Sequence, residues 1–157
     1  MDRLALKKQG KKTLVKGIVT IRMASTTRQA TGRLGENLAT EYLQQQGYCV
    51  LARNVRTAYG EIDLVAQQQV ADLTAELQSA SQVLVFVEVK TRRSQSFGLP
   101  EESVTSAKIA HMQAAAQAYL QANPELDGDW RLDVIAVRLD RQQDKLLEIV
   151  HFENVIP

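Results

Sequence analysis

The chain has 157 residues, of which 45% are hydrophobic and 24% are charged, and its formal net charge is +1. This length and balance are typical of one globular domain with a single core. A single cysteine, Cys49, excludes an internal disulfide and a cysteine-based zinc cluster, and its apolar neighbours predict a buried side chain. No apolar stretch approaches the roughly 18 residues of a membrane span or forms a signal-peptide core, so we expect a cytoplasmic protein without a membrane partner.

The charge is distributed unevenly along the chain. Residues 1–22 carry seven basic residues and one acidic residue, whereas the rest of the chain is acidic on balance. Residues 1–30 also lack sustained hydrophobic periodicity, so we predict a basic, mostly disordered arm before a single domain over residues 31–157. A polyanionic partner and a solubilising extension are both compatible with this arm.

Two helices and five strands are predicted from hydrophobic periodicity and capping residues. The first helix is expected over residues 31–46, with Thr31 as its N-cap and Gly47 as its C-terminal stop. The second helix is expected to begin after Thr105 and to end near residue 121. The strands are expected over residues 48–53, 60–66, 83–91, 130–139 and 146–152. The order α-β-β-β-α-β-β predicts an α/β fold with a mixed sheet flanked by helices.

Charged residues occur at unusual places in two of these strands. The apolar run 83–87 predicts a strand buried on both faces, yet it continues into Glu88 and Lys90. Two-residue spacing places these two side chains on one face, and Glu61 and Asp63 have the same spacing. A buried strand does not normally end in such charges, because an isolated charge costs several kcal/mol to desolvate. The pattern predicts either a cation site or a Glu88–Lys90 ion pair at a solvated strand end.

The first alternative is a divalent cation held by oxygen ligands. Two carboxylates about 4 Å apart repel by roughly 4 kcal/mol at a dielectric constant near 20, unless a cation or a proton neutralises one. Without a nearby cysteine or histidine, Mg²⁺ or Mn²⁺ is favoured over Zn²⁺, with Asp63 and Glu88 as ligands. Lys90 would position or deprotonate a water, or stabilise charge, during phosphodiester hydrolysis. Glu36 is either a solvated helix residue or a carboxylate leaning over the sheet's end.

The motifs together resemble the bacterial YraN-like family. The resemblance rests on Gly-Glu-Ile-Asp-Leu at residues 60–64 and Phe-Val-Glu-Val-Lys-Thr-Arg at residues 86–92, downstream of Gly-Arg-Leu-Gly-Glu at residues 32–36. It extends over nearly the whole predicted domain. This family is similar to archaeal Holliday-junction resolvases and to the PD-(D/E)xK superfamily, so the resemblance implies a restriction-endonuclease-like fold. Ile62 stands where the superfamily's name-giving proline would be.

The resemblance also implies a role for each residue of the motifs. Asp63 and Glu88 would bind the metal together with the backbone carbonyl of Val89, and Lys90 would be the signature lysine. Glu36 would be the accessory carboxylate, so the resemblance favours the site over the solvated helix position for this residue. The implied activity is that of a structure-selective DNA endonuclease, dependent on Mg²⁺ or Mn²⁺ and acting on branched DNA.

DNA is the expected partner, recognised by shape rather than by sequence. The candidate phosphate contacts are the basic residues near the motifs: Arg33, Arg53, Arg56, Arg92, Arg93 and Lys108. Aromatic residues make up 5% of the chain and no base-reading motif is visible. A homodimer is compatible with the sequence. Two other functions stay open. One is a non-catalytic nucleic-acid-binding module with a vestigial site. The other is a protein-interaction factor that uses the polar segment 67–82, which we expect to be a surface insertion between two strands.

Overall fold

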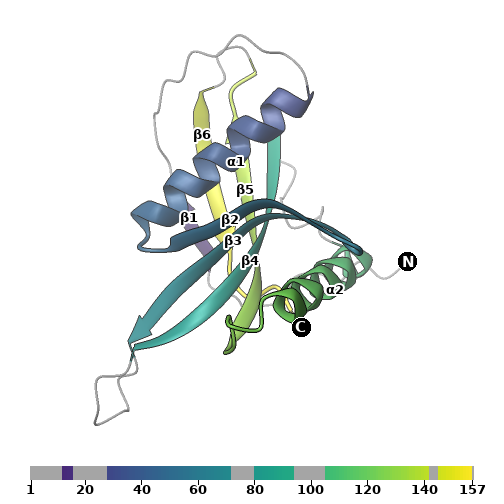
Figure 1. Cartoon of the computed structure of the whole chain (residues 1–157). Coiled ribbons are helices and arrows are strands. Elements are labelled where there is room, and N and C mark those ends of the chain that lie inside the picture. Colours follow the sequence, from purple (N-terminus) through teal and green to yellow (C-terminus); the bar gives the residue numbers. More distant parts are fainter. Residues whose placement is uncertain (1–11, 16–27, 72–79, 94–104, 142–144, 157) are drawn as a thin grey trace.

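The computed structural model describes residues 12–15, 28–71, 80–93, 105–141 and 145–156. These residues form one six-stranded sheet and two helices (Figure 1). In chain order the elements are β1 (Lys12–Val15), α1 (Arg28–Gln45), β2 (Cys49–Thr57), β3 (Gly60–Ala71), β4 (Ala80–Arg93), α2 (Ser106–Ala122), β5 (Trp130–Leu139) and β6 (Leu146–Phe152). The strands lie in the order β1-β6-β5-β4-β3-β2, and β4 and β5 are parallel, whereas the other neighbouring pairs are antiparallel. The predicted α/β class and order of elements are confirmed, with β1 added before α1.

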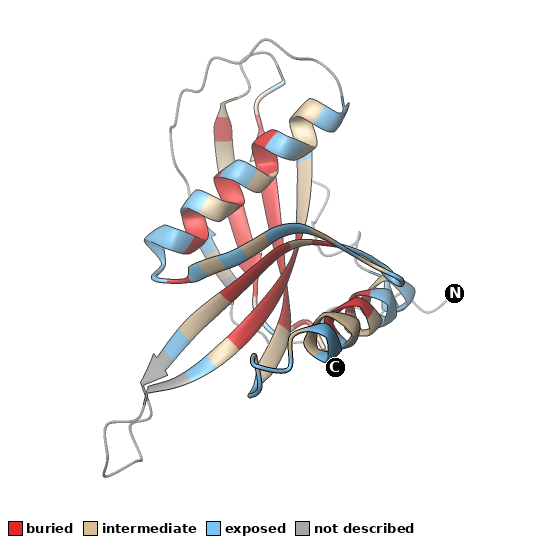
Figure 2. Cartoon of the chain, viewed as in Figure 1, coloured by how far each residue is buried: buried red, intermediate tan, exposed pale blue. Residues whose placement is uncertain are grey.

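The two helices cover opposite faces of the sheet, and β4 contributes to both cores. Val85 and Val87 belong to the cluster that includes α1, whereas Leu84 and Phe86 belong to the cluster that includes α2. All four are buried, and Figure 2 shows the buried segments along the central strands. Neighbouring residues of a strand point to opposite faces, so a doubly covered strand needs an unbroken apolar run. The prediction of a strand buried on both faces is confirmed.

Helix α1 ends where predicted but begins earlier. Gly47 has a φ of 85° and donates its N–H to the carbonyl oxygen of Gln44 at 3.1 Å. The next N–H, of Tyr48, donates to the carbonyl oxygen of Leu43 at 2.9 Å. This is the Schellman arrangement, in which a glycine with positive φ lets the chain satisfy the last helical carbonyls. The predicted N-cap at Thr31 is wrong, because the preceding Arg, Gln and Ala all suit a helix and extend it backwards.

Helix α2 begins at the predicted cap. Thr105 Oγ1 accepts the N–H of Lys108 at 3.2 Å, and the Thr105 carbonyl oxygen accepts the N–H of Ile109 at 3.0 Å. These bonds fix the first turn of α2 and the backbone of Lys108 with it. Asn123 is the C-cap and Pro124 follows it, so α2 ends at Ala122, next to the predicted end near residue 121. Neither described helix is long and apolar enough to cross a membrane.

The predicted disordered arm is wrong at two places. Residues 12–15 form β1, which pairs antiparallel with β6 from Lys12↔Phe152 to Val15↔Ile149. Residues 28–30 belong to α1. Thr13 and Val15 are β-branched, and the open edge of β6 offers backbone partners to a short strand even without a long periodic pattern. The other residues of the predicted arm lie outside the described residues.

The predicted surface insertion 67–82 is wrong at both of its ends. β3 continues to Ala71 and β4 begins at Ala80, with paired residues from Leu64↔Val87 to Ala71↔Ala80. Gln67 Nε2 also donates to Gln82 Oε1 at 2.7 Å across the two strands. The polar sequence therefore continues a two-stranded hairpin, because the backbone ladder can extend past the helix-covered part of the sheet. Residues 72–79 lie outside the described residues.

Strand β2 is the edge of the sheet next to β3, and its ladder is irregular. The register shifts between Val50 and Ala52, and Asn54 has a φ of 51°. The predicted burial of Cys49 is wrong, because this residue is exposed on the edge strand. A short apolar run predicts burial poorly at an edge, where one side of the strand has no neighbour.

Gly35 allows α1 to approach β4 closely beside the candidate site. A Cβ atom at this position would overlap the side chain of Thr91 on β4. We therefore expect Gly35→Ala to lower the free energy of unfolding by about 1–3 kcal/mol in chemical denaturation. Gly32→Ala is the matched control, because a Cβ there meets nothing within 4 Å among the described residues. It should instead stabilise the helix by up to about 1 kcal/mol. Two equal effects would contradict the close approach.

Candidate functional site

Strands β3 and β4 separate at the motif residues. The last residues paired between them are Leu64 and Val87, so Asp63 and Glu88 stand just beyond the end of this ladder. β3 remains paired with β2 through residues 60–64, and β4 remains paired with β5 as far as Arg93. In Figure 1 the β2–β3 hairpin bends toward α2, whereas β4 continues beneath α1. The sheet thus opens at Asp63 and Glu88, which would be the next pair if the ladder continued by one residue.

The carboxylate of Asp63 bridges the two strands where the backbone ladder has ended. Asp63 Oδ2 accepts the N–H of Val89 at 2.7 Å. The pKa of Asp63 is raised from 3.8 to about 7, first by burial and then by the neighbouring carboxylates of Glu88 and Glu36. The Val89 N–H and the charge of Lys108 act in the opposite direction, toward a lower pKa. Asp63 is therefore a carboxyl group crowded by others of the same charge.

Glu88 is buried and held by two lysines. Only 6% of its surface is exposed. Its Oε1 lies 2.8 Å from Lys90 Nζ on β4 and 3.1 Å from Lys108 Nζ on α2. The ion pair between Glu88 and Lys90 is thus present, as the second sequence alternative predicted. It does not lie at a solvated strand end, because the carboxylate is enclosed between the sheet and α2.

A cavity of about 340 Å³ lies between the N-terminal part of α1 and the open end of β4. Its walls are formed by Arg28, Thr31, Gly32, Glu36, Asp63, Val89, Lys90, Thr91 and Arg93. Four of the predicted site residues, Glu36, Asp63, Val89 and Lys90, therefore face one space. Glu88 does not line this cavity and is connected to it through the ammonium group of Lys90.

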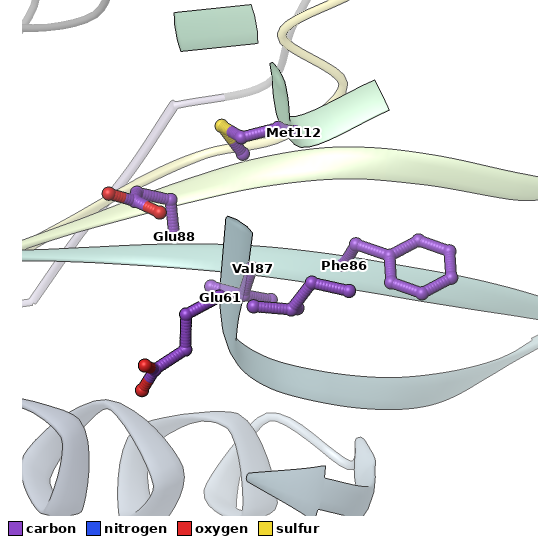
Figure 3. Close-up of a pocket in the computed structure, with 6 residues that line it drawn as sticks. Glu61, Phe86, Val87, Glu88 and Met112 are labelled. Atoms are coloured by element: carbon purple, nitrogen blue, oxygen red, sulfur yellow. The ribbon is translucent and has the colours of Figure 1, made fainter. Parts of the chain in front are cut away.

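Glu61 does not join the other carboxylates. Figure 3 shows a small hollow beside Glu88, where the side chains of Glu61 and Glu88 point in different directions. Glu61 is exposed, and its Oε2 lies 3.7 Å from Arg56 Nε. Among the described residues no group of three acidic, histidine or cysteine side chains is arranged to hold a metal ion. A cation here would depend on Asp63, Glu88, a backbone carbonyl and water, a ligand set that suits Mg²⁺.

The predicted phosphate contacts are dispersed around this end of the molecule. Arg33 and Arg92 are exposed, and Arg93 lines the cavity. Arg53 donates from Nη2 to Asn37 Oδ1 at 2.7 Å, which ties β2 to α1. Arg56 pairs with Glu61, and Lys108 pairs with Glu88. Lys108 is thus the predicted contact that the structure brings directly against a site carboxylate.

A second group of buried charges lies on the α1 face, away from the cavity lining. Asp133 is fully buried on β5, and its two oxygens accept from Arg131 Nε at 3.0 and 3.3 Å. His151 Nε2 lies 2.9 Å from Asp133 Oδ2, and its Nδ1 lies 3.3 Å from the hydroxyl of Tyr42. The backbone N–H of Asn154 also donates to Asp133 at 2.8 Å. Each polar group is satisfied, so this network joins α1, β5 and β6 as part of the core.

Comparison with known proteins places the chain in a family. The family described as "Uncharacterised protein family UPF0102" matches residues 35–137, a range that contains Glu36, Asp63, Glu88 and Lys90. The chain belongs to this family. The membership confirms the predicted relationship to YraN-like proteins.

Relatives and one solved structure extend the comparison. A UPF0102 protein of Syntrophomonas wolfei is 39% identical over 120 residues, which cover 76% of this chain and 94% of the relative. A UPF0102 protein of Mycolicibacterium gilvum is 44% identical over 132 residues, covering 82% and 95% of the two chains. Among solved structures, the MspJI restriction endonuclease in complex with a 27-mer oligonucleotide has a TM-score of 0.36 and 18% identity. That similarity covers 76% of this chain and 23% of the endonuclease.

Proposed function

We propose that this protein is a metal-dependent DNA endonuclease whose site lies where β3 and β4 separate. The observation that carries the proposal is the opening of the sheet between Asp63 and Glu88, with Lys90 lining a cavity beside them. Buried carboxylates next to a lysine are costly to maintain for stability alone, so their concentration at one opening of the sheet favours a chemical role. The cytoplasmic location and the preference for branched DNA remain predictions from the sequence.

The oxygen donors at the opening of the sheet fit a hard divalent cation. Asp63 and Glu88 would hold Mg²⁺ or Mn²⁺ together with the carbonyl of Val89, and Glu36 would add a carboxylate from α1. Burial and then the charge of Glu88 raise the pKa of Asp63 to about 7, so a cation bound between the two carboxylates would relieve their repulsion. When bound, the cation would polarise a phosphodiester oxygen and make water more acidic.

The protein's own residues would bind the phosphate and stabilise its charge. In hydrolysis, a water releases a proton as its oxygen forms a bond to phosphorus, the bond from phosphorus to the leaving ester oxygen breaks, and that oxygen takes up a proton. Lys90 Nζ would donate hydrogen bonds to a non-bridging oxygen, where negative charge increases in the transition state. Glu36 would orient the water from the α1 side, because Glu36 and Lys90 line the same cavity.

Cleavage of defined DNA substrates tests the proposed function directly. Duplex, single-stranded, flap and four-way-junction DNA would each be incubated with Mg²⁺, Mn²⁺ or a chelator. We expect cation-dependent cleavage, fastest on the branched substrates. Salt-sensitive binding without cleavage of any substrate would instead favour the non-catalytic module. Absence of both binding and cleavage would leave the interaction factor as the remaining reading.

DNA binding should depend on the two arginines at the end of β4. Arg92 is exposed and Arg93 lines the cavity, so both can reach a backbone that enters it. We expect Arg92→Ala combined with Arg93→Ala to weaken binding to all sequences equally. The dependence of log K on log salt should flatten by up to about 0.9 per lost phosphate contact. The control is Arg141→Ala, two residues after the end of β5, which should leave the salt dependence unchanged. An unchanged slope in the double variant would refute these contacts.

A further inference from the structure

Lys108 reaches the proposed site from α2 and contacts a buried carboxylate there. Its Nζ lies 3.1 Å from Glu88 Oε1, the oxygen that also lies 2.8 Å from Lys90 Nζ. The Glu88 side chain is 7% exposed, whereas the side chains of Lys90 and Lys108 are 33% and 37% exposed. One buried carboxylate oxygen therefore has two ammonium partners, supplied by two different elements.

The two lysines differ in what else they can reach. Lys90 lines the cavity that also contains Asp63 and Glu36, whereas Lys108 is not part of its lining. The backbone of Lys108 is fixed in the first turn of α2 by the cap at Thr105. Lys90 can thus exchange its contact with Glu88 for a group in the cavity, whereas Lys108 reaches Glu88 from a backbone that the cap of α2 holds in place.

A buried carboxylate that loses one ionic partner needs a second one to compensate its charge. Breaking a buried ion pair by removing one member is strongly destabilising, since the remaining charge is left uncompensated. If Lys90 alone held Glu88, its movement toward a phosphate would leave the bound cation as the only partner of that buried carboxylate. With Lys108 also in place, and with the two ammonium groups repelling each other, the departure of Lys90 is less costly.

We propose that Lys108 is a positioning residue that permanently holds Glu88 and so frees Lys90 to bind the substrate phosphate. This inference rests on the proposed nuclease function, because it requires a phosphate in the cavity. It gives Lys108 a role different from the phosphate contact predicted from the sequence. It also explains why the carboxylate has two lysines where one would neutralise it.

Nitrogen NMR of the lysine side chains tests the exchange of partners without requiring turnover. The full chain, labelled with ¹⁵N-lysine, would be titrated with four-way-junction DNA in Ca²⁺, and binding would be followed separately by fluorescence anisotropy. We expect the Nζ signal of Lys90 to shift on binding while that of Lys108 stays in place. A shift of Lys108, or bound DNA with Lys90 unmoved, would overturn the inference and leave the nuclease proposal standing. Absence of any DNA binding would overturn both.

Substitutions at Lys108 provide the second measurement. We expect Lys108→Met to lower kcat for cleavage by roughly 10- to 100-fold, as loss of an outer partner of a metal-ligating group does, with KM little changed. Lys108→Arg should restore most of the rate, since it keeps a cation beside Glu88. Lys145→Met, which removes one positive charge before β6, should behave as wild type. An increase in KM for DNA without a fall in kcat would assign Lys108 to phosphate binding and contradict the proposal.

Discussion

Replacement of Lys90 by alanine should abolish cleavage while leaving cation binding nearly intact. Lys90 is proposed to contribute an ammonium group to the transition state and no ligand to the metal. Removing a preorganised charge of this kind costs about 10²- to 10⁴-fold in rate. The fold should tolerate the change, because Lys108 still lies 3.1 Å from Glu88 Oε1. Single-turnover cleavage and Mn²⁺ titration by electron paramagnetic resonance measure the two effects separately.

The matched control is Lys145→Ala, which removes the same charge outside the cavity. It should cleave at the wild-type rate. If the Lys90→Ala protein also cleaved at that rate, the activity would belong to another site or to a contaminating nuclease. Parallel loss of Mn²⁺ binding and cleavage would instead show that Lys90 maintains the ligands, contrary to the proposed division of roles.

Replacement of Asp63 by asparagine should stabilise the protein in the absence of divalent cations. The pKa of Asp63 is raised from 3.8 to about 7, first by burial and then by Glu88. Between these two pH values the folded protein keeps a proton that the unfolded chain releases, so stability falls as pH rises through this window. A shift of this size corresponds to about 4 kcal/mol above pH 7. Asparagine removes the free-energy cost of a buried negative charge beside Glu88, and its side-chain oxygen can still accept the Val89 N–H.

Chemical denaturation in chelator across pH 3 to 9 measures this effect. We expect the advantage of Asp63→Asn to be absent near pH 3, to grow between pH 4 and 7, and to stay constant above pH 8. Asp127→Asn, at an exposed position, should show no such dependence. Mg²⁺ at 100 times its Kd should narrow the advantage of Asp63→Asn, because the cation stabilises the wild type by about 2.7 kcal/mol and the variant by less. Equal responses to Mg²⁺ would exclude Asp63 as a ligand.

The elements set by local sequence were predicted accurately. β5 and β6 occupy the predicted residues, and the cap at Thr105 and the stop at Gly47 are confirmed. These features depend on side chains within a few positions of one another. β1 was missed, because a four-residue strand acquires its stability from the partner edge of β6 rather than from its own pattern.

The candidate site was predictable as a set of residues but not as a set of contacts. Two-residue spacing placed Glu88 and Lys90 together, and the structure has them in an ion pair. The approach of Lys108 to the same oxygen depends on how α2 packs on the sheet, which no spacing in the sequence specifies. Asp63 lies on β3 and Glu88 lies on β4, and the two strands stop pairing immediately before these residues. Nothing in the sequence indicates where this pairing ends. The roles of Asp63 and Glu88 in catalysis stay predictions until the variants are measured.

The irregular ladder of β2 has a consequence for how copies of the protein can meet. An incoming strand lengthens a sheet by matching an unbroken row of N–H and C=O groups. The register shift between Val50 and Ala52 and the positive φ of Asn54 interrupt that row twice within five residues. A second molecule therefore finds a poor template there, although Cys49 and Leu51 leave the strand partly apolar. The edge nearest the opening of the sheet resists fibrous growth at high protein concentration, and so remains accessible.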